Sequence, residues 1–451
     1  MSKFIHCDRK TPYLLPPSLQ DWLPEDHLAR FVVEIVSQLD VSALEKAYRG
    51  KGSKPYHPEI LLALLFYGYA TGVFASRKLE RATYDSVAFR YIAANTHPDH
   101  DTIATFRKRF LKQLRPLFTQ VLMIAHQMGV CKLGKVSLDG TKVKAHASKH
   151  HALSWQHANK LEKQLLREVD ELFRLARQAD REDLPDGMSI PEELARRKDR
   201  LATIAQAKAE IEQRAAERYA KEQQDYEKKV ADRAEKAKVT GKKPRGREPK
   251  PPRPGPQPTD QVNLTDEQSR IMPTSGGGFE QAYNAQAAVD MDSLLIVEHH
   301  VTDQANDKQQ IEPALKNLAT LPPELGTIEA LVADAGYFSE GNVTKCQAEH
   351  ITPYIANKRE QHNRSWQARF SSPQAPPHDA DPVKVMDHRL RSTEGRKLYA
   401  KRKCTIEPVF GIIKAVMGFR QFLLRTHDSV CGESTLVCIA WNLKRLHTLT
   451  R

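Results

Sequence analysis

The sequence has few cysteines, and their spacing excludes two kinds of site. The 451 residues include only six cysteines, and none stands in a C-x-x-C pair. A zinc ribbon and a disulfide-stapled scaffold both need closely spaced cysteines, so we expect neither. Scattered thiols of this kind are typical of a protein in a reducing cytosol.

Long apolar runs are missing as well. A membrane-spanning helix needs about 20 consecutive apolar residues, and no run in this chain approaches that length. The N-terminal stretch MSKFIHCDRKTPY contains no apolar segment of the kind found in secretory signals. We therefore expect a cytoplasmic protein without a membrane partner.

Acidic residues are outnumbered by basic ones. The chain has 69 Lys and Arg against 56 Asp and Glu, which gives a formal net charge of +13. A polyanion is the expected partner of such a chain, and nucleic acid is the commonest one. Hydrophobic residues make up 40% of the sequence, which is normal for a globular protein whose length allows roughly three domains.

The first 130 residues predict a helical domain. Pro58–Ala70 is apolar on nearly all sides, as is typical of a helix at the centre of a bundle. Two short amphipathic segments follow between residues 76 and 94. Asp101 then fits the N-cap of a helix that carries Arg107 and two further basic residues. Short helices with a basic last member indicate a helix-turn-helix-like DNA reader, although a bundle with a solvated basic face fits the same pattern.

A charged helical insertion separates two groups of strands. From Trp155 to about Tyr226 apolar residues recur at helical spacing in two runs divided by Pro185-Asp-Gly187, which predicts an antiparallel hairpin or coiled coil. The Pro-rich basic segment Gly241–Pro256 then predicts a flexible linker, with a phosphate-binding role as the alternative. Arg359–Asp381 predicts a mobile loop.

The strands predict a mixed sheet. Lys135–Asp139 alternates apolar and polar residues, and Tyr283–Asp290 with Leu294–Val301 predicts a hairpin. The pattern then predicts a helix over 308–321, a strand over 327–333, a helix over 339–350 and a strand over 351–356. These elements form two strand–helix–strand units, which require parallel pairing.

Three carboxylates stand where these elements end or begin. The apolar stretch TIEALVADAGY predicts a buried strand that ends at Asp334, and Asp139 ends its own strand. Glu407 precedes Pro408, which fits the first turn of a helix. Sites in open sheets form beyond the carboxyl ends of strands. One such acid alone is more often a turn or cap residue, so it is their combination that predicts a site.

Four segments resemble one known family. They are SLDGTKVKAHAS, AYNAQAAVD, VADAGYFS and YAKRKCTIEPVFGIIKAVMGFRQFLLR, which begin at Ser137, Ala282, Val332 and Tyr399. On these motifs the chain resembles the DDE-type transposases of bacterial insertion sequences, and the helical insertion is the least specific part of the likeness. The resemblance implies an α/β ribonuclease-H-like mixed sheet with flanking helices, beside an all-α N-terminal domain and an inserted helical hairpin or coiled coil.

The expected domains follow from the motifs. We expect a helical DNA-binding domain over 1–130 and the first catalytic strand over 131–148. A helical insertion with its basic linker is expected over 149–262, and the remainder of the catalytic domain over 263–451.

The resemblance implies a catalytic and metal-binding set of Asp139, Asp334 and Glu407. In the family three such acids hold Mg²⁺, for which Mn²⁺ substitutes, and Asp139 would be the bridging ligand. Two ions about 4 Å apart activate the attacking oxygen and stabilise the leaving one at phosphorus.

Residues around Glu407 are expected to contact DNA. Many transposases of this class carry a Tyr and an Arg before the Glu, and a Lys or Arg seven positions after it. Lys414 fits that last position, and Tyr399 and Arg402 precede the Glu. Arg402 lies one residue too early, and Lys403 occupies the usual place of the Arg. Lys142 and Arg107 are further candidates.

The implied function is that of a transposase. It would bind the terminal inverted repeats of its element as double-stranded DNA, cleave them and transfer the strands, acting as a homodimer at the bacterial nucleoid. A non-catalytic DNA-binding regulator is the main rival. A hydrolytic nuclease of the same fold and a coiled-coil scaffold are further alternatives.

Overall fold

The chain divides into two compact units, one formed by residues 1–144 with 283–451 and one by residues 145–282. The computed structural model describes residues 18–48, 54–178, 189–241, 246–274, 277–357, 376–377 and 380–451. Most of the predicted loop Arg359–Asp381 and part of the predicted linker Gly241–Pro256 lie outside these ranges.

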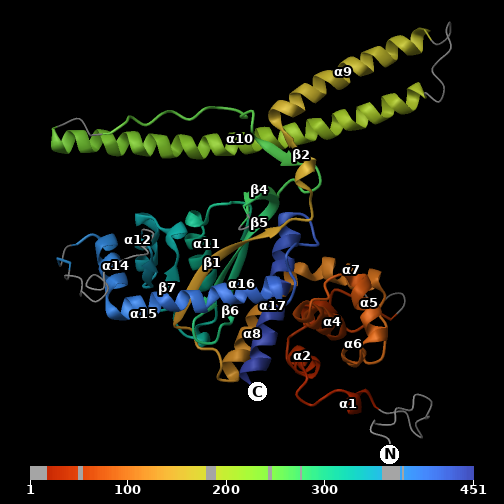
Figure 1. Ribbon diagram of the computed structural model, residues 1–451, viewed down its shortest axis with the longest axis vertical. Helices are drawn as coiled ribbons and strands as arrows, with labels where there is room; N and C mark the ends of the chain where they lie inside the picture. Colours follow the sequence, from red (N-terminus) through yellow and green to blue (C-terminus); the bar gives the residue numbers. More distant parts are fainter. Residues whose placement is uncertain are drawn as a thin grey trace, which may run out of the picture. The chain divides into compact units, whose positions relative to one another are not determined.

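The N-terminal part of the first unit is helical, as predicted (Figure 1). Helix α4 is its centre, because residues Leu61 to Ala70 are buried on every side. His57 caps this helix, and Gly72 ends it in the left-handed region at φ 85°. The helices are α1 (Leu19–Trp22), α2 (Leu28–Ser37), α3 (Ser42–Glu45), α4 (Pro58–Thr71), α5 (Ser76–Asp85), α6 (Val87–Ile92), α7 (His100–Phe110), η1 (Leu111–Gln113) and α8 (Leu114–Gln127).

Helix α7 begins two residues earlier than predicted. Its N-cap is Asp99 and not Asp101, because the Asp99 carboxylate accepts the backbone N–H of Thr102 at 2.7 Å. Asp101 lies inside the first turn, where its charge still favours the helix dipole.

A mixed sheet of six strands follows in the order β4-β5-β1-β7-β8, with β6 paired to β5. The predicted hairpin is present, since β5 and β6 are antiparallel. Of the two strand–helix–strand units, the second gives the predicted parallel pair, β7 with β8. The parallel partner on the other side of β7 is β1, whereas β6 pairs with β5. The strands are β1 (Lys135–Lys144), β4 (Arg270–Pro273), β5 (Phe279–Asp290), β6 (Ile296–Thr302), β7 (Ala330–Ala333) and β8 (Thr352–Ile355).

Strand β1 is longer than predicted. The sequence suggests an end at Asp139, but the strand continues to Lys144. The extension has its own partner, because Lys144 bridges in parallel to Gln421 and accepts the backbone N–H of Phe422 at 2.9 Å. Asp139 therefore lies inside the strand, at the point where pairing with β7 stops at Leu138.

Helices cover the sheet and join it to the N-terminal helices. Helix α17 contacts α4 and α8 as well as β6, so it is shared by both parts of this unit. Trp441 on α17 is buried and donates from Nε1 to the carbonyl oxygen of Leu294 at 3.0 Å. The helices are η3 (Asp307–Gln309), α11 (Ile311–Ala319), η4 (Pro323–Leu325), η5 (Ala335–Tyr337), α12 (Glu340–Ala348), α14 (Pro382–Arg391), α15 (Thr393–Lys401), η6 (Arg402–Cys404), α16 (Ile406–Ala415) and α17 (His427–Leu449).

The second unit is built on the predicted helical hairpin. Helices α9 (Trp155–Gln178) and α10 (Ile190–Thr240) run antiparallel, as the ion pairs Lys208–Glu162 and Arg197–Glu168 show. Their shared core consists of Leu165, Ile204, Ala207, Ile211 and neighbouring apolar residues. Strands β2 (Ala152–Ser154) and β3 (Gln261–Asn263) pair at its base, and η2 (Lys149–His151) precedes them.

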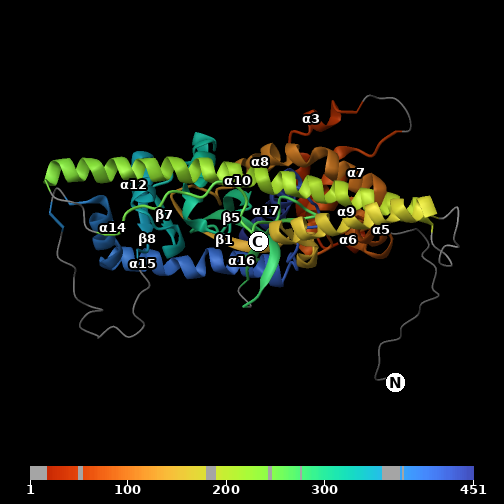
Figure 2. The ribbon, with the colours of Figure 1, turned by 90° about the horizontal axis from the view of Figure 1, so that it is seen from above.

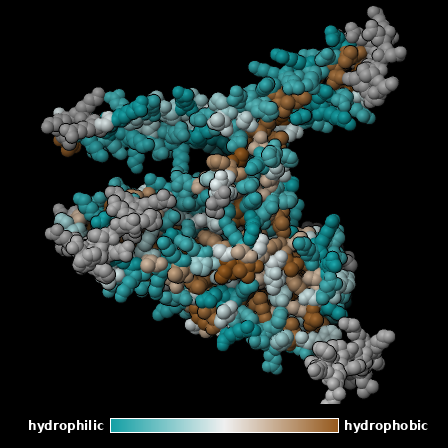
Figure 3. Space-filling view, viewed as in Figure 1, coloured by the Kyte–Doolittle hydropathy of each residue, from teal (hydrophilic) through white to brown (hydrophobic). Residues whose placement is uncertain are grey.

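Helix α10 is longer than α9, and its C-terminal part continues well beyond the N-terminal end of α9 (Figure 2). Hydrophilic residues cover most of the visible surface of both helices (Figure 3). Among the described residues no single helix is long and apolar enough to cross a membrane, although the bent pair α4 and α5 meets that test by length and composition. Helix α4 is buried inside the protein.

Candidate active site

The register of β1 and β7 brings two of the expected acids to the same level of the sheet. Leu138 pairs with Ala333 in the last position of the parallel ladder. Asp139 and Asp334 are the next residues of their strands, so both leave the ladder at the same edge. Sites in this class of fold form beyond the carboxyl ends of parallel strands. Asp334 follows the carboxyl end of β7, and Asp139 lies at the same level within the longer strand β1.

Asp139 is the most enclosed of the three acids. Its Oδ1 accepts the backbone N–H of Gly140 at 2.8 Å, and its Oδ2 accepts from the Arg402 guanidinium at 3.1 Å. Burial raises the pKa of Asp139 to about 6, and the nearby carboxylates of Asp334 and Asp307 act in the same direction. A carboxyl group held under these conditions gains from any cation that enters the site.

Asp334 shapes the turn that follows its strand. Its backbone is extended, and its side chain caps the short helix η5 by accepting the N–H of Gly336 at 2.8 Å. The strand itself is apolar at every position from Ala330 to Ala333 because it is buried on both faces. The first polar residue thus appears where the chain emerges from the core.

Glu407 lies in the first turn of α16, as predicted from the following proline. Val409 and Ile413 on this helix are buried, and Ile412 is partly buried. Val416, at the end of the helix, is 67% exposed. Val416 caps the C-terminus of the helix with its N–H bonded to Ile412, and it has already turned away from the sheet.

Arg402 joins two of the acids. One guanidinium nitrogen donates to Asp139 Oδ2 and another to Glu407 Oε1, each at 3.1 Å. The Arg402 side chain is only 12% exposed, whereas Glu407 is 49% exposed. Its charge therefore balances the buried Asp139 more strongly than the exposed Glu407, where water screens the pair.

The three acids have the chemistry of a divalent-cation site without forming a closed cluster. Carboxylate oxygens are the donors that hard cations such as Mg²⁺ prefer. No group of three or more His, Cys, Asp or Glu side chains lies close enough to hold a metal within the described residues. The Arg402 guanidinium lies where Asp139 and Glu407 face each other, so a cation between these two would displace it.

The basic residues expected near Glu407 have different environments. Lys414 is partly buried, where it donates to the Lys142 carbonyl oxygen at 2.9 Å and to the Thr141 hydroxyl. Burial lowers the pKa of Lys414. Lys142 pairs with Asp307 at 3.2 Å, Tyr399 is partly buried on α15, and Lys403 is exposed on η6.

Arg107 does not lie on a DNA-accessible face of α7. It is 8% exposed, and it donates to the Tyr69 hydroxyl at 3.1 Å and to the Phe74 carbonyl oxygen at 3.0 Å. The DNA contact expected of Arg107 stays a prediction, and in this structure its guanidinium is bonded inside the protein. The sequence shows a basic run, but only the tertiary packing turns one of its members inward.

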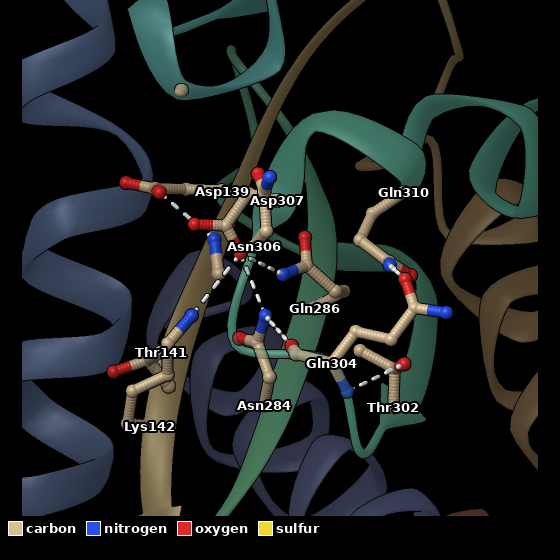
Figure 4. Close-up of polar contacts among 12 residues, drawn as sticks. Asp139, Thr141, Lys142, Asn284, Gln286, Thr302, Gln304, Asn306, Asp307 and Gln310 are labelled. Carbon is tan, nitrogen blue, oxygen red and sulfur yellow. Dashed lines mark hydrogen bonds and ion pairs between the residues drawn. The ribbon is translucent and has the colours of Figure 1, made fainter. Parts of the chain in front are cut away.

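Sequence reasoning missed a polar group beside the site. Asn284 and Gln286 lie on β5, and both donate to Asp307 Oδ1, at 2.6 and 2.7 Å (Figure 4). The signal was present in AYNAQAAVD, where two amides on one face interrupt an otherwise apolar strand. Buried amides on a central strand require partners, and that requirement predicts a polar neighbour.

Comparison with known proteins supports the likeness seen in the motifs. Residues 17–109 match the model described as Transposase domain (DUF772), and residues 249–443 match the model described as Transposase DDE domain. No curated protein and no solved structure matches the chain.

Both models describe transposases, so the protein binds DNA and acts in transposition and DNA recombination. The chain belongs to the DDE-type transposases of insertion sequences. Members of that family generally use divalent metal ions. Asp334 and Glu407 lie within the second matched range, whereas Asp139 lies between the two ranges, so its place in the site depends on the strand register.

Proposed function

We propose that the protein binds the terminal inverted repeats of its own insertion sequence and catalyses metal-dependent cleavage and strand transfer. The observation that carries the proposal is the register of β1 and β7, which brings Asp139 and Asp334 to one edge of the sheet. Arg402 links Asp139 to Glu407, which adds the third acid to the same place. The catalytic domain in this proposal is ribonuclease-H-like, interrupted by the insertion over 149–262, and residues 1–130 bind DNA.

Asp139, Asp334 and Glu407 would hold Mg²⁺, for which Mn²⁺ substitutes. The bound ions supply charge that activates an attacking oxygen and stabilises a leaving oxygen at phosphorus. The three side chains offer only oxygen donors, which suits these ions. Asp139, whose pKa is raised to about 6, binds a cation in exchange for a proton or for Arg402.

Arg402 then becomes free to contact DNA. A guanidinium released from two carboxylates matches a phosphate group equally well, because carboxylates and phosphates alike present paired oxygen acceptors. Lys403, Lys142, Lys414 and Tyr399 lie on the elements next to the acids and would contact the backbone of the element end. Water is the nucleophile for cleavage, and the freed 3′-hydroxyl is the nucleophile for joining to target DNA.

Two element ends must be held together for transposition, so we propose a homodimer in the DNA complex. The helical hairpin of α9 and α10 is the candidate contact, since its outer surface includes exposed Leu166 and Phe173. Double-stranded DNA as substrate places the protein at the nucleoid of the bacterial cytoplasm.

A transposition assay in cells tests the proposal. The gene is supplied beside a marker framed by its own flanking DNA, as wild type and as Asp139→Asn, Asp334→Asn and Glu407→Gln. These changes keep the shape of each side chain and remove its charge. We expect marker movement with the wild type alone, with at least about a hundredfold loss in each variant.

The control is Glu324→Gln, which removes an exposed carboxylate on η4. Movement with all three site variants would exclude these acids from catalysis. Binding of flanking DNA by a wild type that never moves the marker would favour the non-catalytic regulator, and cleavage without joining would favour a hydrolytic nuclease.

A further inference from the structure

A fourth carboxylate, Asp307, lies close to Asp139 without belonging to the motif. It begins η3, after β6, and its Oδ1 accepts three donors. These are Lys142 Nζ at 3.2 Å, Asn284 Nδ2 at 2.6 Å and Gln286 Nε2 at 2.7 Å (Figure 4). One oxygen thus accepts hydrogen bonds from the Lys142 ammonium on β1 and from the two amides on β5.

Core packing alone does not explain why two amides are buried at these positions. Asn284 and Gln286 are 0% and 1% exposed on β5, which lies between β1 and β6 in the sheet. Burying an amide costs free energy unless it is hydrogen-bonded, and an apolar residue would pack at less cost on a central strand. Asn284 Oδ1 is buried without a partner among the described residues, so even this network leaves one acceptor unsatisfied. The pair therefore serves something other than core packing.

The network packs directly against the residue after Asp139. A Cβ atom added to Gly140 would lie 2.1 Å from Gln286 Nε2, 2.8 Å from Asp307 Oδ1 and 2.9 Å from Asn284 Oδ1. Only glycine lets the backbone of β1 approach this closely. The position of the Asp139 backbone is consequently set by the orientation of the three polar side chains.

The same network reaches the turn after Asp334. Gln286 Oε1 accepts the hydroxyl of Tyr337, which is buried at the end of η5. Asn342 then donates to the Tyr337 carbonyl oxygen and to the Lys308 carbonyl oxygen, both at 2.7 Å. The turn after Asp334 and the helix that carries Asp307 are thereby tied together.

We propose that Asp307 is a positioning residue that, through Gln286 and Asn284, fixes the distance between Asp139 and Asp334 for metal binding. The inference rests on the proposed function of those two aspartates. Asp307 fixes the orientation of the two amides. Gln286 in that orientation bonds Tyr337, and the network packs against Gly140, which fixes the position of β1. Asp307 also holds the Lys142 ammonium at the edge of the site.

The test compares Asp307→Asn with the wild type in cleavage of duplex DNA that carries the gene's own flanking sequences. An asparagine can keep an oxygen at the Oδ1 position, but a neutral amide oxygen is a weaker acceptor than a carboxylate for the Lys142 ammonium and the two amides, so all three contacts weaken. We expect cleavage at saturating Mg²⁺ to fall about tenfold to a hundredfold, the range typical when a group that supports metal ligands from outside their shell is changed. The Mg²⁺ concentration for half-maximal cleavage should rise by a similar factor.

Two readouts separate positioning from folding. Binding of the same DNA in EDTA should stay as in the wild type, and the variant should remain folded at the assay temperature, with only a modest fall in its thermal unfolding midpoint. Gln286→Leu should give the same defect, and the double variant should be no worse than either single one, because both changes break one chain of contacts. Glu324→Gln is the matched control and should cleave as the wild type does.

If Asp139→Asn is inactive, two results for Asp307→Asn would overturn this inference alone. The first is cleavage and Mg²⁺ dependence like those of the wild type. The second is a loss of cleavage that is matched by equal losses of DNA binding and of stability. Cleavage by Asp139→Asn at the wild-type rate would instead overturn the proposed function, and the positioning role with it.

Discussion

At the scale of single residues, the site depends on contacts between side chains that are far apart in the sequence. Arg402 pairs with both Asp139 and Glu407, each at 3.1 Å. Its guanidinium balances these two negative charges in the structure. In the proposed function a cation takes over that balance, and the same guanidinium would pair with a phosphate group of the DNA.

Gly140 gives the sharpest prediction at this scale. We expect Gly140→Ala to abolish cleavage of flanking DNA, because its Cβ would lie 2.1 Å from Gln286 Nε2. Forcing an atom into such a space typically costs about 1–3 kcal/mol. The strand shifts or the network breaks, and either change moves Asp139. Cleavage assays and thermal unfolding of the purified protein measure both effects.

The matched control is Gly341→Ala on α12, where no atom lies within 4 Å of the added Cβ. Alanine there should leave cleavage unchanged. A Gly140→Ala protein that cleaves like this control would show that the close approach is not needed for catalysis.

At the scale of elements, helix α17 is fastened to the N-terminal helices by a buried carboxylate. Glu433 Oε1 accepts the Tyr69 hydroxyl of α4 at 2.8 Å, and Arg107 of α7 donates to the same hydroxyl. Glu433 Oε2 accepts the backbone N–H groups of Leu423 and Leu424 at 2.9 and 3.0 Å. The role of Arg107 is therefore to join helices.

This group predicts a pH dependence of stability. Burial raises the pKa of Glu433, although its hydrogen bonds and Arg107 act in the opposite direction. The folded protein therefore keeps this proton at pH values where the unfolded chain, with a pKa near 4.5, has released it. The stability from this carboxyl group is complete below the unfolded pKa and is lost as pH rises through the folded pKa.

The comparison is between the wild type and Glu433→Gln, in thermal unfolding from about pH 4 to about pH 7. We expect the difference in unfolding midpoint between the two proteins to shrink as pH rises from the lower limit. Other titrating groups contribute equally to both proteins and cancel. A difference that stays constant, or grows with pH, would contradict the raised pKa.

At the scale of the whole molecule, the helical hairpin is a separate compact unit inserted into the chain. Its entry and exit are adjacent, because Ser154 pairs with Gln261 between β2 and β3. The insertion can therefore be removed at its base without stretching the strands of the other unit. This gives a direct test of its part in assembly.

We predict that replacing residues 155–260 with a short Gly-Ser linker leaves a folded protein that binds one element end and no longer pairs two. The hairpin core of Leu165, Ile204 and Ile211 is contained within the deleted segment, so no core residue of the first unit is removed. Light scattering of the DNA complex measures the stoichiometry. A complex that still contains two ends and two protein chains would place the dimer contact outside the hairpin.

The sequence by itself determined most of the elements, and it predicted the three acids of the proposed site. Apolar periodicity is a local property, so it predicted α4, the hairpin of α9 and α10, and the alternation of β7, α12 and β8. Asp334 was found because a buried strand must end where a charged residue appears. Asp139 was expected at the end of its own strand, which is wrong: the strand continues to Lys144 because residues 420–422 supply a partner that no local pattern reveals.

Only the tertiary structure decided which polar groups meet. The sequence predicts that Arg107 is exposed and that Arg402 binds DNA. In the structure Arg107 is buried against Tyr69, and Arg402 pairs with Asp139. Asp307, Gln286 and Tyr337 come from three segments that hydrophobic packing brings together. The strength of a polar contact depends on burial and on the distance to its partner, and both are set only when the chain is folded.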